Sequence, residues 1–474
     1  MSGVIDRASI STLITLLLLA LSLLLRSWAS LDAFWLDEIW SYYLSTLVNQ
    51  PVDILTEIRI DNNHPLNTFY MYLVGDQANW AIYRIPALLL GTATVAILGL
   101  SSKELNGTPW ITMLLGAVSL PLIQYSSEAR GYGPAAFFAV TAWYIYAFRL
   151  RVHSSNRWLM GFWLCCILGI LSHATFLFVF LALCIIWCRE FLKHREHSKL
   201  INGLRVFTLP GLFILAMCGF FYSQLSPGGD QSSLEITTVL LQLTTTLTGS
   251  PNTGLYPLLA TALLMVLVCG GISLLPDEHR WFFAALIMVP IVLLLVYQPR
   301  FFFLRYLMVC IPFFYLLVDQ ALSGLLKTGT SLNKACAAFV LLYIVAGSGL
   351  LVKDYLRWGK GDYPAAIEQM HRLHPEEVFT VGSDFDFRNK SILEFYARLR
   401  PDGGKLTYIE EAHLQTEPTD LFITHDQQQN PGANKFIRLE NNSVYNLIGI
   451  YPYAGLSGWN WYIYRYTDEP VTTP

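Results

Sequence analysis

The sequence has little charge. Of its 474 residues only 14% are charged, where a soluble chain carries about 25%, and 54% are hydrophobic. The mean hydropathy is +0.44. The 31 lysines and arginines do not outnumber the 34 aspartates and glutamates, so the basic excess that neutralises a nucleic-acid backbone is missing. These shortages exclude a soluble enzyme, a disordered scaffold and a nucleic-acid-binding protein.

Cysteine is absent from residues 353–474, and all eight cysteines lie in apolar runs. The sequence therefore predicts neither disulfides nor a cysteine zinc site, and the thiols are interpreted as small residues of a membrane core. A P-loop, a Rossmann glycine fingerprint and a Gly-x-Ser-x-Gly elbow are also missing. No cofactor is expected, and a requirement for a divalent metal ion stays open.

What the sequence has instead is long apolar runs. A membrane helix needs roughly 20 apolar residues to cross ~30 Å of hydrocarbon. Eleven runs predict a polytopic α-helical membrane protein, although 158–188 is too long for one helix and short for two, with Ser172-His173 as the break. The predicted spans are 10–28, 81–100, 110–125, 133–149, 158–172, 173–188, 206–222, 254–275, 281–297, 306–321 and 335–352.

The few charges are concentrated near the C-terminus, because residues 353–474 hold 29 of the 65. This predicts a membrane domain over 1–352, with a long outer loop at 29–80, and a soluble domain over 353–474. Residue patterns in the soluble part predict a small α/β domain. Its expected strands are Glu377–Gly382, Asp420–Thr424 and Trp459–Tyr466, and its expected helices are Tyr363–Leu373 and Ser391–Leu399.

The short loops indicate how the chain is oriented. With the N-terminus inside, the inner segments carry 13 lysines and arginines, and the opposite side carries six before the soluble domain. This bias favours an N-terminus in the cytoplasm. An odd number of spans then places residues 353–474, and the long loop 29–80, on the extracytoplasmic side.

Two adjacent carboxylates, Asp37 and Glu38, follow the first span among large apolar residues. Charges beside hydrocarbon are costly and often functional, and partial desolvation makes a carboxylate a better base. The alternative is that one of them caps a helix over Ile39–Leu47. In the same loop His64 precedes Pro65, which predicts an extended turn into a helix over Leu66–Leu73.

His64 has three possible roles. It can orient a carboxylate, share a metal site with Asp37 or Asp61, or cap the helix that follows, and the sequence alone favours capping. His173, in contrast, is interpreted as a core histidine with its hydrogen bonds satisfied. Both lie in segments that the predicted topology places on the outer face.

Arginines with aromatic neighbours lie at the outer ends of later spans. Glu128 and Tyr132 flank Arg130, which can bind a lipid phosphate or pair with Glu128. Arg300 and Arg305 flank three phenylalanines and precede Tyr306, a pattern that suits a phosphate on an apolar tail, although arginines at helix ends also extend to lipid head groups. Together with the carboxylates, these residues predict transfer of a group from a lipid phosphate to an outward-facing acceptor.

Four patches resemble the membrane glycosyltransferases of the GT-C fold, and most closely the bacterial relatives of protein mannosyltransferases and of the lipid A aminoarabinose transferase (families 39 and 83). They are Trp35–Glu38, Asp61–Leu66, Ser127–Tyr132 and Arg305-Tyr306 with Pro312. The segment Gly361–Ala366 also resembles the domain after the last span in many bacterial members. This sequence departs from the family pattern at His64-Pro65 and at Gly131.

The resemblance implies inverting transfer from a polyprenyl-phosphate sugar to a lipid, glycan or protein acceptor, at the periplasmic face of a bacterial inner membrane. Asp37 would then be the general base and Glu38 would position it or the sugar. Arg130, Tyr132 and Arg305 would hold the donor phosphate. His64, Glu128, Arg300 and Tyr306 complete the predicted donor site. The competing hypotheses are a flippase for polyprenyl-linked glycans, a glycan polymerase or ligase using a lipid diphosphate, and a non-catalytic membrane anchor.

Overall fold

The computed structural model of the chain divides into two compact units. The membrane unit holds Met1–Ser30 and Leu44–Val352, and the C-terminal unit holds Leu31–Tyr43 and Lys353–Pro474. The second unit thus includes thirteen residues of the first outer loop, among them Asp37 and Glu38. The structure describes residues 7–77, 79–151, 155–226, 228, 235–297, 302–375, 377–414, 418–427 and 432–467.

Each of the eleven predicted spans is helical. Seven helical segments of the described chain are long and apolar enough to cross a membrane: α1, α5, α11 with the short η2, α13, α14, η3 with α15, and α16. The bounds are α1 Arg7–Ala29, α5 Ala81–Glu104, α6 Pro109–Val118, α7 Leu120–Tyr125, α8 Tyr132–Ile145, η1 Tyr146–Leu150, α9 Asn156–Ser172, α10 Phe176–His194, α11 His197–Phe220, η2 Tyr222–Gln224, α12 Ile236–Thr248, α13 Tyr256–Leu274, α14 Asp277–Tyr297, η3 Leu304–Cys310, α15 Ile311–Lys327 and α16 Ser331–Trp358.

Two of the predicted spans have features that the apolar runs do not show. The run 110–125 is divided at Ser119, whose extended backbone ends α6 and whose Oγ accepts a hydrogen bond from the N–H of Leu122 at the start of α7. The run 158–188 forms two helices, α9 and α10, because His173 has an extended backbone (φ −163°, ψ 142°). The predicted break at Ser172-His173 is therefore confirmed.

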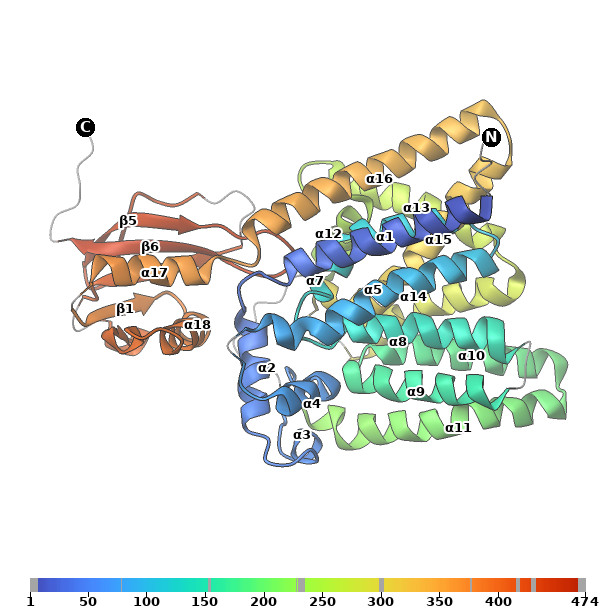
Figure 1. The fold of residues 1–474 in the computed structure, drawn as a ribbon, viewed down its shortest axis with the longest axis horizontal. Coiled ribbons are helices and arrows are strands. Elements are labelled where there is room, and N and C mark those ends of the chain that lie inside the picture. Colours follow the sequence, from blue (N-terminus) through green and yellow to red (C-terminus); the bar gives the residue numbers. More distant parts are fainter. Residues whose placement is uncertain are drawn as a thin grey trace, which may run out of the picture. The chain divides into compact units, whose positions relative to one another are not determined.

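The core of the membrane unit is aromatic and lies among α8, α10, α14 and α15. The Trp143 ring stacks on Phe282 at 5.4 Å and meets Phe313 edge-on at 5.5 Å. Figure 1 shows α8, α9, α10 and α11 running side by side, in agreement with the contacts of α9 with α8 and α11. This packing positions α8, which begins at the predicted site residue Tyr132, and α9, which ends next to His173.

The segment 44–80 contains the short helices α3 (Asp53–Thr56) and α4 (Pro65–Val74), which follow the end of α2 (Leu36–Thr46). The predicted helix Leu66–Leu73 is confirmed as α4, with Pro65 in its first turn. Asn63 holds the approach to α4, since its Nδ2 donates to the carbonyls of Ile54 and Ile58. The position of His64 is therefore set by a buried polar contact rather than by a free loop.

The C-terminal unit contains a six-stranded sheet of order β2-β1-β3-β6-β5-β4, in which β1, β2 and β3 are parallel and the other pairs are antiparallel. Helices α17 and α18 contact this sheet. The predicted small α/β domain is confirmed. The elements are α17 Tyr363–Leu373, β1 Phe379–Ser383, α18 Asp386–Arg398, η4 Gly403–Lys405, β2 Leu406–Tyr408, η5 Glu411–His413, β3 Leu421–Asp426, β4 Phe436–Arg438, β5 Val444–Tyr451 and β6 Asn460–Thr467.

The sequence predicted α17 residue for residue, and it predicted β1, β3 and β6 to within two residues. It missed β2 and β4 because strands of three residues are too short to show an alternating pattern. It missed β5 because this strand carries a bulge between Leu447 and Gly449, which interrupts the alternation.

Candidate functional site

Asp37 and Glu38 lie inside the first turn of α2. The N–H groups of Glu38 and Ile39 both donate to the carbonyl of Trp35 at 2.9 Å, so the helix is already formed at these residues. The prediction that one of the two carboxylates caps a helix beginning at Ile39 is therefore wrong, because the helix begins three residues earlier. In the first turn both carboxylates are favoured by the helix dipole.

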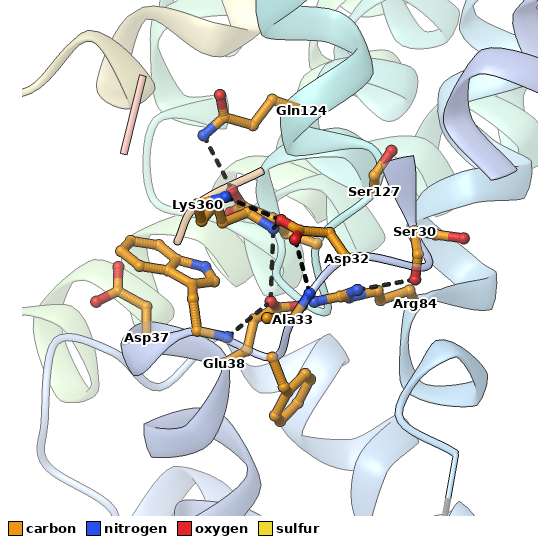
Figure 2. A network of polar contacts seen from close by, with 12 residues as sticks. Ser30, Asp32, Ala33, Asp37, Glu38, Arg84, Gln124, Ser127 and Lys360 are labelled. Carbon is orange, nitrogen blue, oxygen red and sulfur yellow. Dashed lines mark hydrogen bonds and ion pairs between the residues drawn. The ribbon is translucent and has the colours of Figure 1, made fainter. Parts of the chain in front are cut away.

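The two neighbouring carboxylates differ in burial. Glu38 is 0% exposed, and its Oε2 accepts a long hydrogen bond of 3.5 Å from the N–H of Trp35. Asp37 is only partly buried, and Figure 2 shows its side chain pointing away from the polar network that Glu38 joins. Of the pair, Asp37 is thus the carboxylate that a substrate can reach.

His64 occupies the position before α4, with the extended backbone (φ −99°, ψ 96°) that a following proline favours. Its side chain makes no hydrogen bond to the helix, so the prediction that His64 caps α4 is wrong. The ring instead lies between two distant segments. Nδ1 is 3.2 Å from the carbonyl oxygen of Ser172, and Nε2 is 2.9 Å from Nη2 of Arg130.

These two contacts fix the protonation of the His64 ring. A carbonyl oxygen only accepts hydrogen bonds, so Nδ1 carries the proton that is donated to Ser172. A guanidinium only donates, so Nε2 is the acceptor and the ring is neutral. Burial, with a smaller effect of the nearby Arg305 guanidinium, lowers the pKa of His64 to about 4. His64 therefore acts as a hydrogen-bond acceptor that orients Arg130.

Arg130 lies in the short connection between α7 and α8. The carbonyl of the neighbouring Ala129 accepts a hydrogen bond of 2.7 Å from Nδ2 of Asn67 in α4, which fixes this connection. Arg130 is 3% exposed, and its guanidinium lies 5.1 Å from the Tyr132 ring centre. Glu128 is fully buried and accepts from Gln124 at 3.3 Å. The connection between α7 and α8 thus holds the Arg130 guanidinium in a fixed position beside the Tyr132 ring.

His173 and η3 bring a second set of groups to the same place. The His173 ring stacks on His64 at 5.0 Å, and it lies 4.5 Å from Tyr132 and 6.2 Å from Tyr306. The Arg305 guanidinium lies 6.0 Å from the centre of the Tyr306 ring. Four separate segments of the membrane unit therefore meet at one cluster. We call the following set the arginine cluster: His64, Arg130, Tyr132, His173, Arg305 and Tyr306.

The electrostatics of the arginine cluster suit an anion. Burial, with the nearby cations, holds the pKa of His173 well below its usual value, so both imidazoles are neutral near pH 7. Burial and the Arg305 guanidinium lower the pKa of Arg130 to about 10, which leaves it protonated. Two guanidiniums thus act on a common region with aromatic walls, and this arrangement matches the oxygens of a phosphate.

The structure brings most of the predicted donor-site residues together. His64, Arg130, Tyr132, Arg305 and Tyr306 all belong to the arginine cluster. Glu128 is not in this set and accepts from Gln124, and Arg300 lies outside the described residues. His173, interpreted from the sequence as a satisfied core histidine, does accept a hydrogen bond from the N–H of Thr175, yet it is also a member of the cluster. Its position at the predicted break between two apolar runs was the signal that could have connected it to the site.

A metal site is not found among the residues that the structure describes, because no group of three or more histidines, cysteines, aspartates and glutamates there is placed to hold an ion. The suggestion that His64 shares a metal ion with Asp37 or Asp61 stays a prediction. In the structure His64 uses both of its ring nitrogens in contacts with Ser172 and Arg130.

No protein-family model and no curated protein matches the chain. Among solved structures it is similar to ArnT from Cupriavidus metallidurans in the apo state, with 12% identity, 88% of this chain and 93% of that chain covered, and a TM-score of 0.48. It is also similar to ArnT from the same organism bound to undecaprenyl phosphate, with 12% identity, 89% and 93% coverage, and a TM-score of 0.45. At these values no residue role is transferred from that protein to this chain.

Proposed function

We propose that this chain is a GT-C membrane glycosyltransferase that moves a sugar from a polyprenyl-phosphate donor to an acceptor hydroxyl on the extracytoplasmic face. The observation that carries the proposal is the arginine cluster. Arg130 and Arg305 come from separate segments and act on one region enclosed by neutral imidazoles and aromatic rings. A guanidinium can donate two parallel hydrogen bonds to two oxygens of a phosphate, and the aromatic rings suit a ligand with an apolar tail.

The proposed reaction needs no protonating acid at the donor. The acceptor oxygen attacks the anomeric carbon, and the bond from that carbon to the phosphate oxygen breaks with inversion. Polyprenyl phosphate leaves with the electron pair of that bond. A phosphate monoester has a second pKa near 6 and is a good leaving group, so fixed cations that stabilise its developing charge are sufficient. Arg130 and Arg305 have this role in the proposal.

The proton of the acceptor hydroxyl passes to Asp37 in the proposed mechanism. Asp37 is supported by its place in the first turn of α2 and by its partial exposure. Glu38 has no exposed surface, so the proposal gives it a supporting role and not contact with the sugar. One accessible base is sufficient for this chemistry, whereas glycoside hydrolases need a pair of carboxylates.

The proposed location is a bacterial inner membrane, with the active site and the C-terminal unit on the periplasmic side. This orientation is supported by the excess of lysine and arginine in the loops assigned to the cytoplasm. A lipid, glycan or protein hydroxyl facing the periplasm would then be the acceptor. The sugar is left unassigned, because nothing in the described residues distinguishes one hexose or pentose from another.

The test is transfer of radiolabelled sugar from a polyprenyl-phosphate donor in proteoliposomes of the purified protein. Wild-type protein is expected to move label into an acceptor fraction. The Asp37→Asn variant is expected to be slower by about 10²- to 10⁴-fold, the usual contribution of a positioned base. Asp76→Asn is the matched control, because Asp76 is an exposed aspartate of the same outer loop, and it should keep wild-type rates.

Two results would contradict the proposal. Label that crosses the bilayer without forming a new glycosidic bond would indicate a flippase. Transfer that is unchanged in Asp37→Asn would exclude this residue as the base. Arg130→Ala and Arg305→Ala should both raise the donor concentration needed for half-maximal rate. Arg59→Ala should not, because Arg59 is only partly buried and lies outside the arginine cluster.

A further inference from the structure

The segment that carries Asp37 belongs to the same compact unit as the C-terminal domain. Residues Leu31–Tyr43 are grouped with Lys353–Pro474 and not with the membrane helices that flank them. Phe34 shows the packing, since its ring lies 5.8 Å from Phe395 and its carbonyl accepts a hydrogen bond of 2.8 Å from the Tyr396 hydroxyl. The C-terminal unit therefore contributes to the local structure around Asp37.

Lys360 is a charged residue that lies close to the carboxylates of this segment. Its Nζ lies 3.8 Å from Oδ2 of Asp32 and 3.7 Å from Oε2 of Glu38. Figure 2 shows the lysine side chain directed at both carboxylates. The side chains of Lys360 and Glu38 are 0% exposed, and that of Asp32 is 20% exposed. A single ammonium thus lies between one fully buried carboxylate and one that is mostly buried.

The backbone around Lys360 is fixed to the same groups. The Lys360 N–H donates to Oδ2 of Asp32 at 3.0 Å. Its carbonyl accepts from the hydroxyl of Tyr363 at 2.8 Å and from the N–H of Trp459 at 3.2 Å. Three hydrogen bonds therefore hold the backbone of Lys360, which fixes the point from which its side chain reaches the two carboxylates.

The residue before Lys360 has to be glycine for this contact to form. Gly359 has φ +57°, which side chains rarely adopt, and a Cβ there would lie 2.1 Å from Oδ1 of Asp32. The sequence Gly359-Lys360 thus allows the backbone to approach Asp32 closely enough for both the N–H and the ammonium to reach it.

We infer that Lys360 is a positioning residue for Asp37, and this inference rests on the function proposed above. A substrate does not reach Lys360 or Glu38, because neither exposes any side-chain surface. Lys360 therefore acts through Asp32 and Glu38. These carboxylates lie before and within the first turn of α2, on either side of the segment that leads to Asp37. Removing the ammonium leaves buried carboxylates without their counter-charge, and the turn that holds Asp37 rearranges.

The test compares three variants in the transfer assay. Lys360→Met keeps the length of the side chain and removes the charge, Lys360→Arg keeps the charge, and Lys390→Met is the matched control. Lys390 also pairs with two glutamates, Glu394 and Glu410, but it lies on the exposed surface of α18 in the same unit. Thermal unfolding of each purified variant shows whether it is folded.

Lys360→Met is expected to lower kcat by about 10²-fold, which a displacement of a catalytic group by about 1 Å can cause. The KM for the donor should change less than about 3-fold, because the arginine cluster is untouched. Lys360→Arg should recover most of the rate, and Lys390→Met should match wild type. This split between kcat and KM, with rescue by arginine, is not expected of a lysine that only stabilises the fold.

A folded Lys360→Met protein with wild-type kcat would overturn the inference while leaving the proposed function intact. An equal loss of rate in Lys360→Met and Lys360→Arg would overturn it as well, since charge would not be the cause. If Lys360→Met does not fold, Asp32→Asn replaces it, and an unchanged kcat in that variant would also overturn the inference. A wild-type protein that transfers no sugar from any polyprenyl-phosphate donor would overturn the proposed function and the inference with it.

Discussion

Replacing His64 by alanine perturbs the arginine cluster at the residue that orients Arg130. The change removes the hydrogen bond of 2.9 Å between Nε2 and the Arg130 guanidinium and the bond of 3.2 Å to the Ser172 carbonyl. A bond to a charged group contributes ~1.5–3 kcal/mol and a neutral one ~1 kcal/mol, and both groups are buried. The free energy of unfolding should therefore fall by roughly 2–4 kcal/mol.

The same substitution should weaken binding of polyprenyl phosphate. Without its acceptor, the Arg130 guanidinium is no longer held in one orientation, so part of the binding energy is spent on ordering it. We expect an affinity about 10- to 100-fold lower, which corresponds to ~1.4–2.8 kcal/mol. His64→Gln should be closer to wild type, because a glutamine oxygen can still accept from the guanidinium.

Protonation of His64 gives the experiment a second readout. The pKa of His64 in the folded protein is about 4, below its ordinary value near 6.5, because the ring is buried. The unfolded chain therefore binds this proton first as the pH falls. The contribution of neutral His64 to the free energy of unfolding is fully present above pH ~6.5. It is lost between pH ~6.5 and ~4, at up to ~1.4 kcal/mol per pH unit. In His64→Ala the free energy of unfolding should therefore depend less steeply on pH than in wild type. The part of the pH dependence that comes from His173 should remain.

The assay is thermal unfolding in detergent from pH 7.5 to 4.5, with binding of polyprenyl phosphate measured at pH 7. The matched control is His279→Ala, because His279 is also a buried imidazole among aromatic rings but lies outside the arginine cluster. His279→Ala should lower the free energy of unfolding without changing the affinity for polyprenyl phosphate. If His64→Ala bound the lipid phosphate as tightly as wild type, the assignment of the cluster as the donor-phosphate site would be refuted.

Two further predictions concern packing. Gly131→Ala would place a Cβ 1.8 Å from the carbonyl oxygen of Ser172, so we expect a loss of about 1–3 kcal/mol in unfolding free energy by thermal melting, and a gain in stability would contradict the geometry. Asp319→Ala removes a buried carboxylate that accepts from Ser102 at 2.6 Å and from the N–H of Thr108 at 3.0 Å. Asp319→Ala should lower the free energy of unfolding by about 3 kcal/mol or more, with no change in the KM for the donor. A melting temperature equal to that of wild type would show that these hydrogen bonds do not stabilise the fold.

The membrane helices could be predicted from the sequence because their signal is local. A run of about 20 apolar residues is helical wherever it lies, since hydrocarbon leaves the backbone no other partner. The same holds for α17, whose apolar residues recur at helical spacing. Local signals failed where tertiary contacts decided the outcome, as at β5 with its bulge and at α2, which begins at Leu36 and encloses both carboxylates.

The sequence by itself determined that several polar residues would lie at the ends of helices, because a charge in the middle of the hydrocarbon is too costly. Only the tertiary structure decided which of them meet. His64 and Arg130 are 66 residues apart, and Asp32 and Lys360 are 328 residues apart, so no periodicity relates them. The role of His64 changed from helix cap to acceptor for Arg130 for this reason. A side chain's hydrogen-bond partner is set by the packing of whole helices, which a sequence pattern does not encode.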